Sequence, residues 1–182
     1  MSRKETTDIT GYEHVTHTFG PVYDQDSKIL ILGSMPSVKS REQQFYYGHP
    51  QNRFWKVLAA VYGEQVPDTI AGKTDFLLRN HVALWDVIAS CDIVGSSDSS
   101  IRNVRANDMG VILSAADVST IFLNGGKAYE LFMKYCRKYV HEDKPMIVKL
   151  PSTSPANAAW SLDRLTEAWR EAVRNRKGIS VL

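Results

Sequence analysis

Short runs of consecutive hydrophobic residues, many of them β-branched, recur along the chain. Three of them are Lys28–Gly33, Val118–Leu123 and Met146–Leu150, and a fourth, Val82–Ile88, is centred on Trp85. Runs of this length without polar alternation are typical of strands that are buried on both faces of a parallel sheet. The pattern predicts three strands, while Val82–Ile88 fits either a strand or an extended segment.

The segments between these runs carry hydrophobic residues every three to four positions, which predicts amphipathic helices that bury one face. The predicted helices cover Arg53–Tyr62, Asp75–Asn80, Asn107–Ala116, the segment after Asn124-Gly125-Gly126, and Leu162–Val173. Ser161 is a candidate N-cap of the last helix, because its hydroxyl can accept a hydrogen bond from a free backbone N–H of the first turn.

Alternating strands and helices predict an α/β fold, a three-layer sandwich with a central, mostly parallel β-sheet flanked by helices. The chain has 182 residues, a length that suits one domain, residues 1–182, in which we expect residues 1–15 to be a peripheral N-terminal segment. Ligands of such sheets bind at the carboxyl ends of the strands. We therefore expect the functional site in the loops that follow Leu32, Leu123 and Leu150.

Composition and charge narrow the class of protein. Hydrophobic residues make up 43% and charged residues 23% of the chain, with a net charge of +2, as in an ordinary globular protein. No apolar run approaches the roughly 20 residues that cross a bilayer. Residues 1–10 are polar and unlike a secretory signal, so we expect a cytoplasmic protein, associated with the nucleoid and not with a membrane.

The two cysteines, Cys91 and Cys136, are far apart in sequence and belong to no C-x-x-C pair. Zinc and iron–sulfur sites need more thiolates at closer spacing, so we expect two free thiols, no metal site and no cofactor. Gly125-Gly126-Lys127 lacks the spacing of a phosphate-binding loop, which argues against a nucleoside triphosphate site.

Two of the loops after predicted strands have unusual compositions. The first, 33–55, is long, polar and aromatic and has no clear secondary structure, which is typical of a functional loop. The second, 151–160, combines hydroxyls, two prolines and small residues, which can approach phosphates closely. The alternatives are an aromatic flap packed on the core for the first loop and a rigid surface turn for the second.

Three motifs in these loops resemble the uracil-DNA glycosylase superfamily, most closely its hypoxanthine-DNA (deoxyinosine) glycosylase branch. They are Gly-Ser-Met-Pro-Ser at 33–37, Phe-Tyr-Tyr-Gly-His-Pro-Gln-Asn-Arg-Phe-Trp at 45–55 and Leu-Pro-Ser-Thr-Ser-Pro-Ala-Asn-Ala at 150–158. The resemblance spans roughly Lys28 to Val173. It implies a uracil-DNA glycosylase-like fold, also seen in the mismatch-specific uracil and thymine glycosylases.

The resemblance also implies a monofunctional DNA glycosylase. Such an enzyme would hydrolyse the N-glycosidic bond of deaminated bases in DNA, hypoxanthine first, with uracil or xanthine as further substrates. The product is an abasic site, so the implied partners are DNA containing deaminated bases and the base excision repair enzymes that act on abasic sites. No lysine stands out as a Schiff-base nucleophile, so we expect no lyase activity. We expect a monomer.

One departure from the family changes the assignment of the catalytic residue. The mismatch-specific relatives have a water-positioning Asn in a Gly-x-Asn-Pro motif, where this chain has Met35. A thioether cannot hold water as an amide can. The hypoxanthine branch also lacks that Asn and relies on an Asn of the aromatic loop, which corresponds to Asn52. The alternative role for Asn52 is a cap of the helix that follows it.

The resemblance assigns a base-binding set to the first loop. Its members are Gly33, Ser34, Met35, Pro36, Phe45, Tyr47 and His49. The backbone N–H groups of Ser34 and Met35 would bind the base carbonyl. Tyr47 would stack on the base, and Phe45 and Tyr46 are the alternative candidates for this role. His49 is a candidate acid, and a structural histidine before Pro50 is the favoured alternative.

The DNA-contacting set comes from the second loop and from two cations of the first. Its members are Ser152, Ser154, Pro155, Ala156, Asn157, Lys39 and Arg41. Ala156 and Asn157 stand near the place where relatives insert a bulky wedge into the base stack, and neither has that character. We therefore expect a preference for loosened or single-stranded sites. Solvated surface charges are the alternative for Lys39 and Arg41.

Three other functions remain open on the sequence. A uracil-preferring glycosylase would differ by one pocket contact. A non-catalytic DNA-lesion-binding domain would explain Met35. A hydrolase of free nucleosides would have no DNA for the second loop to hold.

Overall fold

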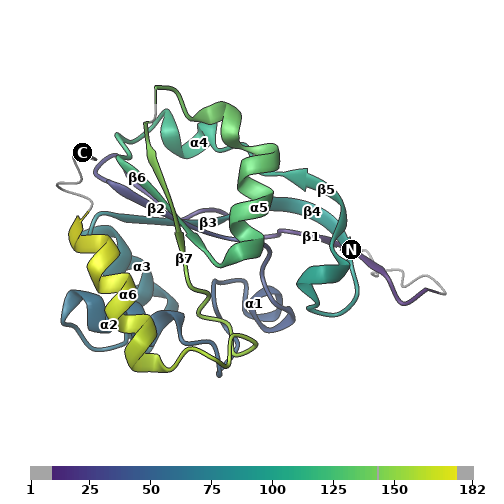
Figure 1. The fold of residues 1–182 in the computed structure, drawn as a ribbon, viewed down its shortest axis with the longest axis horizontal. Coiled ribbons are helices and arrows are strands. Elements are labelled where there is room, and N and C mark those ends of the chain that lie inside the picture. The colour runs from purple at the N-terminus through teal and green to yellow at the C-terminus, as the bar shows by residue number, and fades with distance from the viewer. Residues whose placement is uncertain (1–9, 143, 176–182) are drawn as a thin grey trace.

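A four-stranded parallel sheet forms the centre of the molecule in a computed structural model that describes residues 10–142 and 144–175 (Figure 1). Its strands, in spatial order, are β3 (Val82–Asp86), β2 (Ile29–Gly33), β6 (Thr120–Asn124) and β7 (Met146–Leu150). Every neighbouring pair is parallel. The three predicted strands are confirmed, and Val82–Asp86 is a fourth.

Helices cover both faces of this sheet, as the α/β prediction requires. They are α1 (Val38–Gln43), α2 (Phe54–Tyr62), α3 (Ile70–Arg79), α4 (Gly110–Leu113), α5 (Gly126–Tyr135) and α6 (Leu162–Asn175), with 3₁₀ turns at Asp98–Ser100 and Arg137–Tyr139. Figure 1 shows α2, α3 and α6 on one side and α4 and α5 on the other. This doubly wound arrangement confirms the predicted α/β fold class.

A second sheet was not predicted. It is antiparallel, with the order β1 (Glu13–Thr16), β4 (Ile88–Ile93) and β5 (Arg102–Ala106). Of the expected peripheral segment, residues 1–9 lie outside the described part of the chain, whereas Val15 of β1 is fully buried. Because the outer strands have exposed faces, their sequences lack the continuous apolar runs of the parallel sheet.

Two helix predictions had wrong bounds, and the first loop was wrongly expected to lack secondary structure. The loop contains α1, whose first turn is capped by Ser37, the acceptor of a hydrogen bond from the Ser40 N–H. The helix predicted from Asp75 begins earlier because Thr69 caps it through the Gly72 N–H. The helix predicted over Asn107–Ala116 is the single turn α4.

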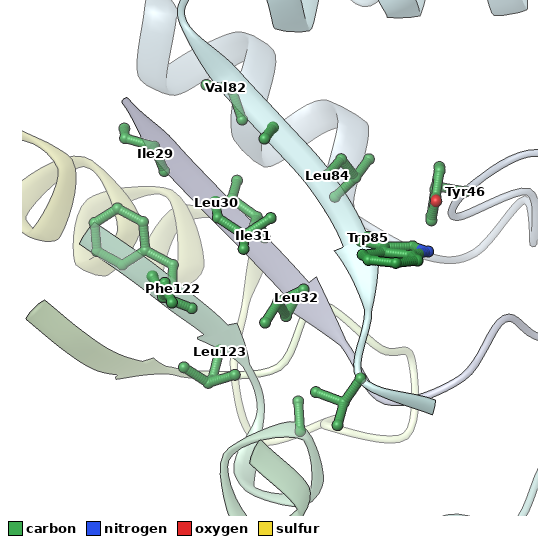
Figure 2. Packing of buried hydrophobic residues seen from close by; sticks show 14 of the residues in the cluster. Ile29, Leu30, Ile31, Leu32, Tyr46, Val82, Leu84, Trp85, Phe122 and Leu123 are labelled. Atoms are coloured by element: carbon green, nitrogen blue, oxygen red, sulfur yellow. The ribbon is translucent and has the colours of Figure 1, made fainter. Parts of the chain in front are cut away.

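The core lies between the parallel sheet and its helices (Figure 2). All five positions of β2 and of β3 are buried, and Phe122 of β6 and Trp169 of α6 are fully enclosed. Cys91 and Cys136 are buried free thiols, as predicted. Burial raises the pKa of each thiol to about 11.

None of the helices in residues 10–142 and 144–175 is long and apolar enough to span a membrane. The same ranges hold no group of three or more His, Cys, Asp or Glu side chains that could bind a metal ion.

Candidate active site

A cavity of about 570 Å³ opens at the carboxyl ends of the parallel strands, where the two loops meet. This volume suits a small organic ligand such as a nucleobase. Its lining includes residues from both loops, from strand ends and from the 95–99 turn: Gly33, Ser34, Met35, Pro36, Ser37, Ser40, Arg41, Tyr46, Tyr47, His49, Asn52, Asp86, Asp98, Asn124, Ser152, Thr153, Ser154, Pro155 and Ala156.

The floor of the cavity is formed where β2 and β3 end side by side. Gly33 pairs with Asp86 across the two strands. A Cβ atom on Gly33 would lie 2.5 Å from Asp86 Oδ1 and 3.0 Å from the Tyr47 hydroxyl. Both polar groups therefore converge over a backbone that has no side chain, and a ligand can approach them only because residue 33 is glycine.

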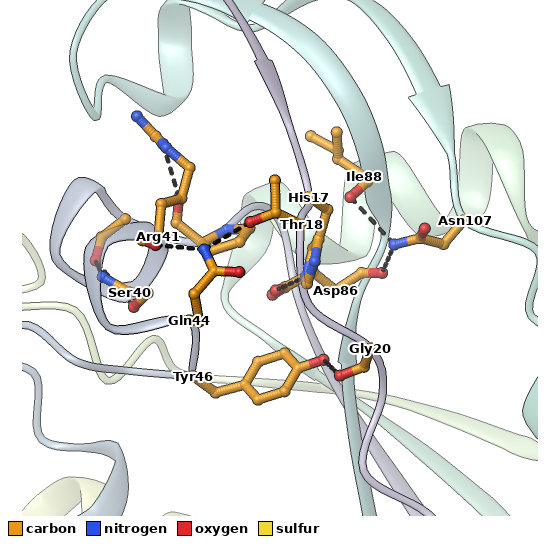
Figure 3. A network of polar contacts seen from close by, with 12 residues as sticks. His17, Thr18, Gly20, Ser40, Arg41, Gln44, Tyr46, Asp86, Ile88 and Asn107 are labelled. Carbon is orange, nitrogen blue, oxygen red and sulfur yellow. Dashed lines mark hydrogen bonds and ion pairs between the residues drawn. The ribbon is translucent and has the colours of Figure 1, made fainter. Parts of the chain in front are cut away.

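Asp86 is held by a buried histidine (Figure 3). His17 Nε2 lies 2.8 Å from Asp86 Oδ2, and the two side chains are only 2% and 5% exposed. The other carboxylate oxygen, Oδ1, has no hydrogen bond within the described part of the chain, and Asp86 lines the cavity. A buried carboxylate thus presents one unused acceptor to the cavity.

One wall of the cavity is a hydrogen-bonded chain that joins three elements. Asn124, at the end of β6, donates from Nδ2 to the Tyr47 hydroxyl (3.1 Å) and to Thr153 Oγ1 (3.0 Å). Its Oδ1 accepts from the Thr153 backbone N–H at 3.0 Å. Thr153, which is fully buried, donates a hydrogen bond from its hydroxyl to Asn52 Oδ1 at 2.9 Å. This series of hydrogen bonds fixes Tyr47 and Asn52 relative to the sheet.

Asn52 lines the cavity together with Met35 and Ser154, and its amide orientation is fixed. Oδ1 accepts from the Phe54 backbone N–H at 2.9 Å and from the Thr153 hydroxyl at 2.9 Å. Because a backbone N–H can only donate, the oxygen must face Phe54. Asn52 is not the N-cap of α2, which is Arg53, but its side chain binds the N–H of the first helical residue, Phe54. The group left over for a ligand is the Nδ2 amino group, a donor.

Tyr47 lies against Phe54 in a stacked arrangement, with ring centroids 3.9 Å apart and planes 18° apart. Its φ of +52° is in the left-handed region, which is unfavourable for a bulky residue and is often found at functional sites. Burial, with the nearby Asp86 carboxylate, raises the pKa of the Tyr47 phenol far above its ordinary value. The phenol is therefore neutral and keeps its proton for hydrogen bonding.

His49 lines the cavity, but one of its ring nitrogens is committed to the loop. Nδ1 is the acceptor for the Gln51 backbone N–H at 3.2 Å. This contact stabilises the turn before Asn52 and favours the structural interpretation of His49 over an acid role.

Two predicted site residues of the first loop have contacts that the sequence did not predict, and for one of them, Phe45, the prediction was wrong. Phe45 is 8% exposed, does not line the cavity and stacks on Trp55 with centroids 6.0 Å apart, so it is a core residue. Arg41 lines the cavity, and its side chain, which is 12% exposed, donates to Glu13 Oε1 and to the Pro36 carbonyl. These bonds give it a structural role, and its predicted contact with DNA stays a prediction.

Lys39 lies away from the cavity on the exposed side of α1, where it pairs with Glu42 at 3.1 Å. A surface pair of this kind is weak. The predicted phosphate contact of Lys39 stays a prediction.

The second loop is ordered by its own side chains. Ser152 Oγ accepts from the Ser154 N–H at 3.1 Å, and Ser154 Oγ accepts from the Ala156 N–H at 3.2 Å. Asn157 Nδ2 donates to the Ser152 carbonyl at 3.0 Å. Pro155 and Ala156 are exposed at the rim, whereas Asn157 lies in a shallow groove beside the cavity.

Arg53 ties this loop to the start of α2. Its guanidinium donates to four backbone carbonyls, those of Thr153 (3.3 Å), Ser154 (2.8 Å), Asn157 (3.1 Å) and Trp160. Its backbone N–H donates to the Thr153 carbonyl as well, at 3.1 Å. A guanidinium is suited to this task because its donors are rigid and diverge in one plane.

Several residues of the site were missed by the sequence analysis. They are His17, Arg53, Asp86, Asp98, Asn124 and Thr153. Asn124 carried a usable signal, a polar side chain directly after a predicted strand. Asp98, at the rim, has its pKa raised by desolvation, with Lys127 and the Ser34 hydroxyl opposing the shift.

Known proteins resemble this chain in both sequence and structure. Residues 21–173 match the family described as the uracil DNA glycosylase superfamily. The chain is 36% identical to a hypoxanthine DNA glycosylase of Methanosarcina acetivorans and 32% identical to one of Methanosarcina barkeri, over 86% of this chain and 97% and 96% of theirs. A solution NMR structure of a candidate uracil DNA glycosylase from M. acetivorans superimposes with a TM-score of 0.72 at 34% identity, covering 88% of this chain and 97% of that one.

Proposed function

Because this chain belongs to the uracil DNA glycosylase superfamily, we propose that it is a monofunctional DNA glycosylase that removes deaminated bases, hypoxanthine first, from DNA. The observation that carries the proposal is the cavity itself. It has the volume of a base site, a polar floor at Asp86, a stacking wall at Tyr47 and a carboxamide at Asn52. The two relatives named hypoxanthine DNA glycosylase support the choice of substrate.

The floor would form hydrogen bonds with the edge of a base that has been flipped out of the duplex. A nucleotide enters such a cavity base first, so the deepest groups meet the base and the rim meets the sugar and phosphates. Asp86 Oδ1 would accept the N1–H of hypoxanthine, and the backbone N–H groups of Ser34 and Met35 would donate to O6. Adenine presents a lone pair at N1 and an amino group at C6, which is the opposite pattern.

The wall would hold the base in place. Phe54 covers one face of the Tyr47 ring at 3.9 Å, which leaves the other face for a base. Stacking of a base on an aromatic ring is worth about 1–3 kcal/mol. The neutral phenol, bound to Asn124, would keep the ring at one angle.

Hydrolysis would then need one water molecule at the anomeric carbon. The water oxygen forms a bond to C1′ and releases one proton to solvent, the C1′–N9 bond breaks, and its electron pair leaves with the base, which takes up a proton from solvent. The transition state resembles an oxocarbenium ion, so placement of the water matters more than its deprotonation. Asn52 Nδ2 would donate to this water and hold it, while the amides at the floor stabilise charge on the departing base.

The second loop would hold the DNA strand at the rim, through the Ser152 and Ser154 region and the exposed Pro155 and Ala156. Enzymes that process abasic sites in the nucleoid would act on the product. We expect the protein to act as a monomer. Uracil is a second candidate substrate, because its N3–H and O4 present the same donor and acceptor as hypoxanthine.

The direct test is cleavage of labelled oligonucleotides that contain inosine, uracil, xanthine or only normal bases, in single- and double-stranded form, with a chelator present. Alkali converts each abasic site into a strand break. We expect breaks at inosine, weaker breaks at uracil and none in the undamaged strand. Binding without breaks would identify a lesion-binding domain, and cleavage of free deoxyinosine alone would identify a nucleoside hydrolase.

A further inference from the structure

His17 lies outside both loops of the cavity, in the segment between β1 and β2. Its backbone N–H donates to the Ala89 carbonyl at 2.8 Å, which ties the segment to β4. Its ring lies against Phe19, with centroids 4.5 Å apart, and near Tyr46, at 5.9 Å. The ring therefore cannot swing away from Asp86 without displacing aromatic neighbours.

This ring makes its only described side-chain hydrogen bond to Asp86. Nε2 lies 2.8 Å from Asp86 Oδ2, and because an ionised carboxylate only accepts, Nε2 is the donor. Nδ1 is buried and has no partner in the described part of the chain. A buried nitrogen without a partner is unfavourable, so general stability does not explain why a histidine stands here in place of an apolar residue.

The contact with His17 determines how many oxygens of Asp86 are free to bind donors of a base at the cavity floor. A carboxylate with both oxygens free can bind two adjacent N–H donors at once. Guanine offers such a pair, N1–H and the 2-amino group, whereas hypoxanthine offers N1–H alone on that edge and uracil offers N3–H alone. His17 is bonded to Oδ2, and both side chains are almost completely buried, so Oδ1 is the oxygen that remains without a partner to face the base. Two adjacent donors of a base therefore cannot each meet a separate free oxygen.

The geometry points to His17 as a specificity-determining positioning residue that leaves Asp86 one free oxygen to present to the base and so separates hypoxanthine from guanine. The inference rests on the proposed function. Guanine differs from hypoxanthine by a single amino group, and a site that binds polar groups discriminates best when an added donor finds no acceptor. His17 thus protects normal guanine from cleavage although it does not touch the base itself.

The test uses single-stranded oligonucleotides of thymidine with one inosine or one guanine, so that the cost of opening a base pair does not enter. His17→Phe keeps the ring volume but removes the donor, which frees the carboxylate to turn about its Cβ–Cγ bond. We expect the ratio of guanine to inosine cleavage to rise by about tenfold or more, the value of one hydrogen bond to a charged group. His17→Gln, whose amide nitrogen can take the place of Nε2, should restore the wild-type ratio.

A second variant keeps the test valid if His17→Phe does not fold. His17→Asn is polar but too short to reach Oδ2, so it should raise the same ratio, with folding checked by thermal unfolding. An unchanged ratio in folded variants that still cleave inosine would overturn the inference while leaving the proposed function intact. If the wild-type protein cleaves inosine in no strand, the proposed function itself fails.

Discussion

The floor and the rim of the cavity are built in different ways. At the floor, Asp86 and Asn124 stand on strand ends, and each is bonded to a residue of another element. At the rim, Ser152 and Ser154 bond within their own loop, and Pro155 is exposed. The floor is suited to recognising one base, and the rim is suited to holding any DNA strand. Substitutions should therefore separate base choice from DNA binding.

Asn52, between floor and rim, should give the largest effect. Asn52→Asp keeps the oxygen that accepts from Phe54 and Thr153 but replaces the Nδ2 donor, so folding should change little while turnover on inosine falls by about 100-fold or more. Asn52→Ala should lose a similar factor and also about 1 kcal/mol of stability. Single-turnover rates and thermal unfolding measure the two effects. An Asn52→Asp variant with wild-type turnover would contradict the donor role.

Gly33→Ala tests the floor without removing any polar group. A Cβ atom at residue 33 would overlap with Asp86 Oδ1, at 2.5 Å, so the Asp86 side chain must shift and the space proposed for the base is reduced. We expect kcat/KM for inosine to fall by about 10- to 100-fold. Binding to DNA with an abasic site should be nearly unchanged. Gly20→Ala is the matched control, because its Cβ would meet no atom within 4 Å. Equal losses of abasic-site binding and cleavage would place the defect in the fold.

Tyr47→Ala removes the stacking wall and should raise KM for inosine-containing DNA by about tenfold, in line with the loss of one base–aromatic stack. Tyr47→Phe keeps the ring but loses the contact with Asn124, so its effect should be smaller. Abasic-site binding is the control. A Tyr47→Ala enzyme with unchanged KM would remove Tyr47 from the base site.

Alkaline pH should destabilise the folded protein through two buried phenols, those of Tyr46 and Tyr47. Burial raises the pKa of Tyr46 and Tyr47 in the folded protein, whereas an unfolded tyrosine titrates near its ordinary value. Their contribution to stability is therefore complete below about pH 10 and is lost as the pH rises further, by about 1 kcal/mol per pH unit for each. Denaturation of the wild type and of Tyr46→Phe across this range measures it. Identical pH dependence in both would contradict the assignment.

Substitutions at the rim should have the smallest effect on DNA affinity, and this effect should not distinguish inosine-containing from undamaged strands. Ser154→Ala removes the acceptor for the Ala156 N–H, so the loop loosens and affinity should fall by about threefold. The loss should be the same for inosine-containing and undamaged strands, because contacts at the rim carry no base information. Titrations with both strands test this. A loss confined to inosine would move Ser154 to the base site.

The sequence predicted those parts of the molecule that depend on local pattern. The buried parallel strands have continuous apolar runs, and the 33–55 loop could be placed after one of them. The antiparallel sheet was missed because strands such as Arg102–Ala106 are largely exposed and carry charges. Neighbouring aromatics could not be separated either, since the left-handed backbone at Tyr47 sends it to the cavity while Phe45 faces the core.

The polar residues of the site were missed in the sequence for a different reason. Asp86 was assigned to an apolar run, and His17 lay in a segment with no pattern at all. Their roles arise from the alignment of β2 with β3 and from a contact across 69 positions of sequence. Pairings of this kind depend on the tertiary fold, and one sequence contains no local signal for them.

Arg53 links the proposed catalytic residue to the proposed DNA-contacting loop. It follows Asn52 directly in the chain, and its guanidinium donates to four backbone carbonyls of the second loop. A displacement of that loop would therefore be transmitted through Arg53 to Asn52. If both proposed roles hold, we expect a DNA strand that is poorly placed on the loop to be hydrolysed slowly as well.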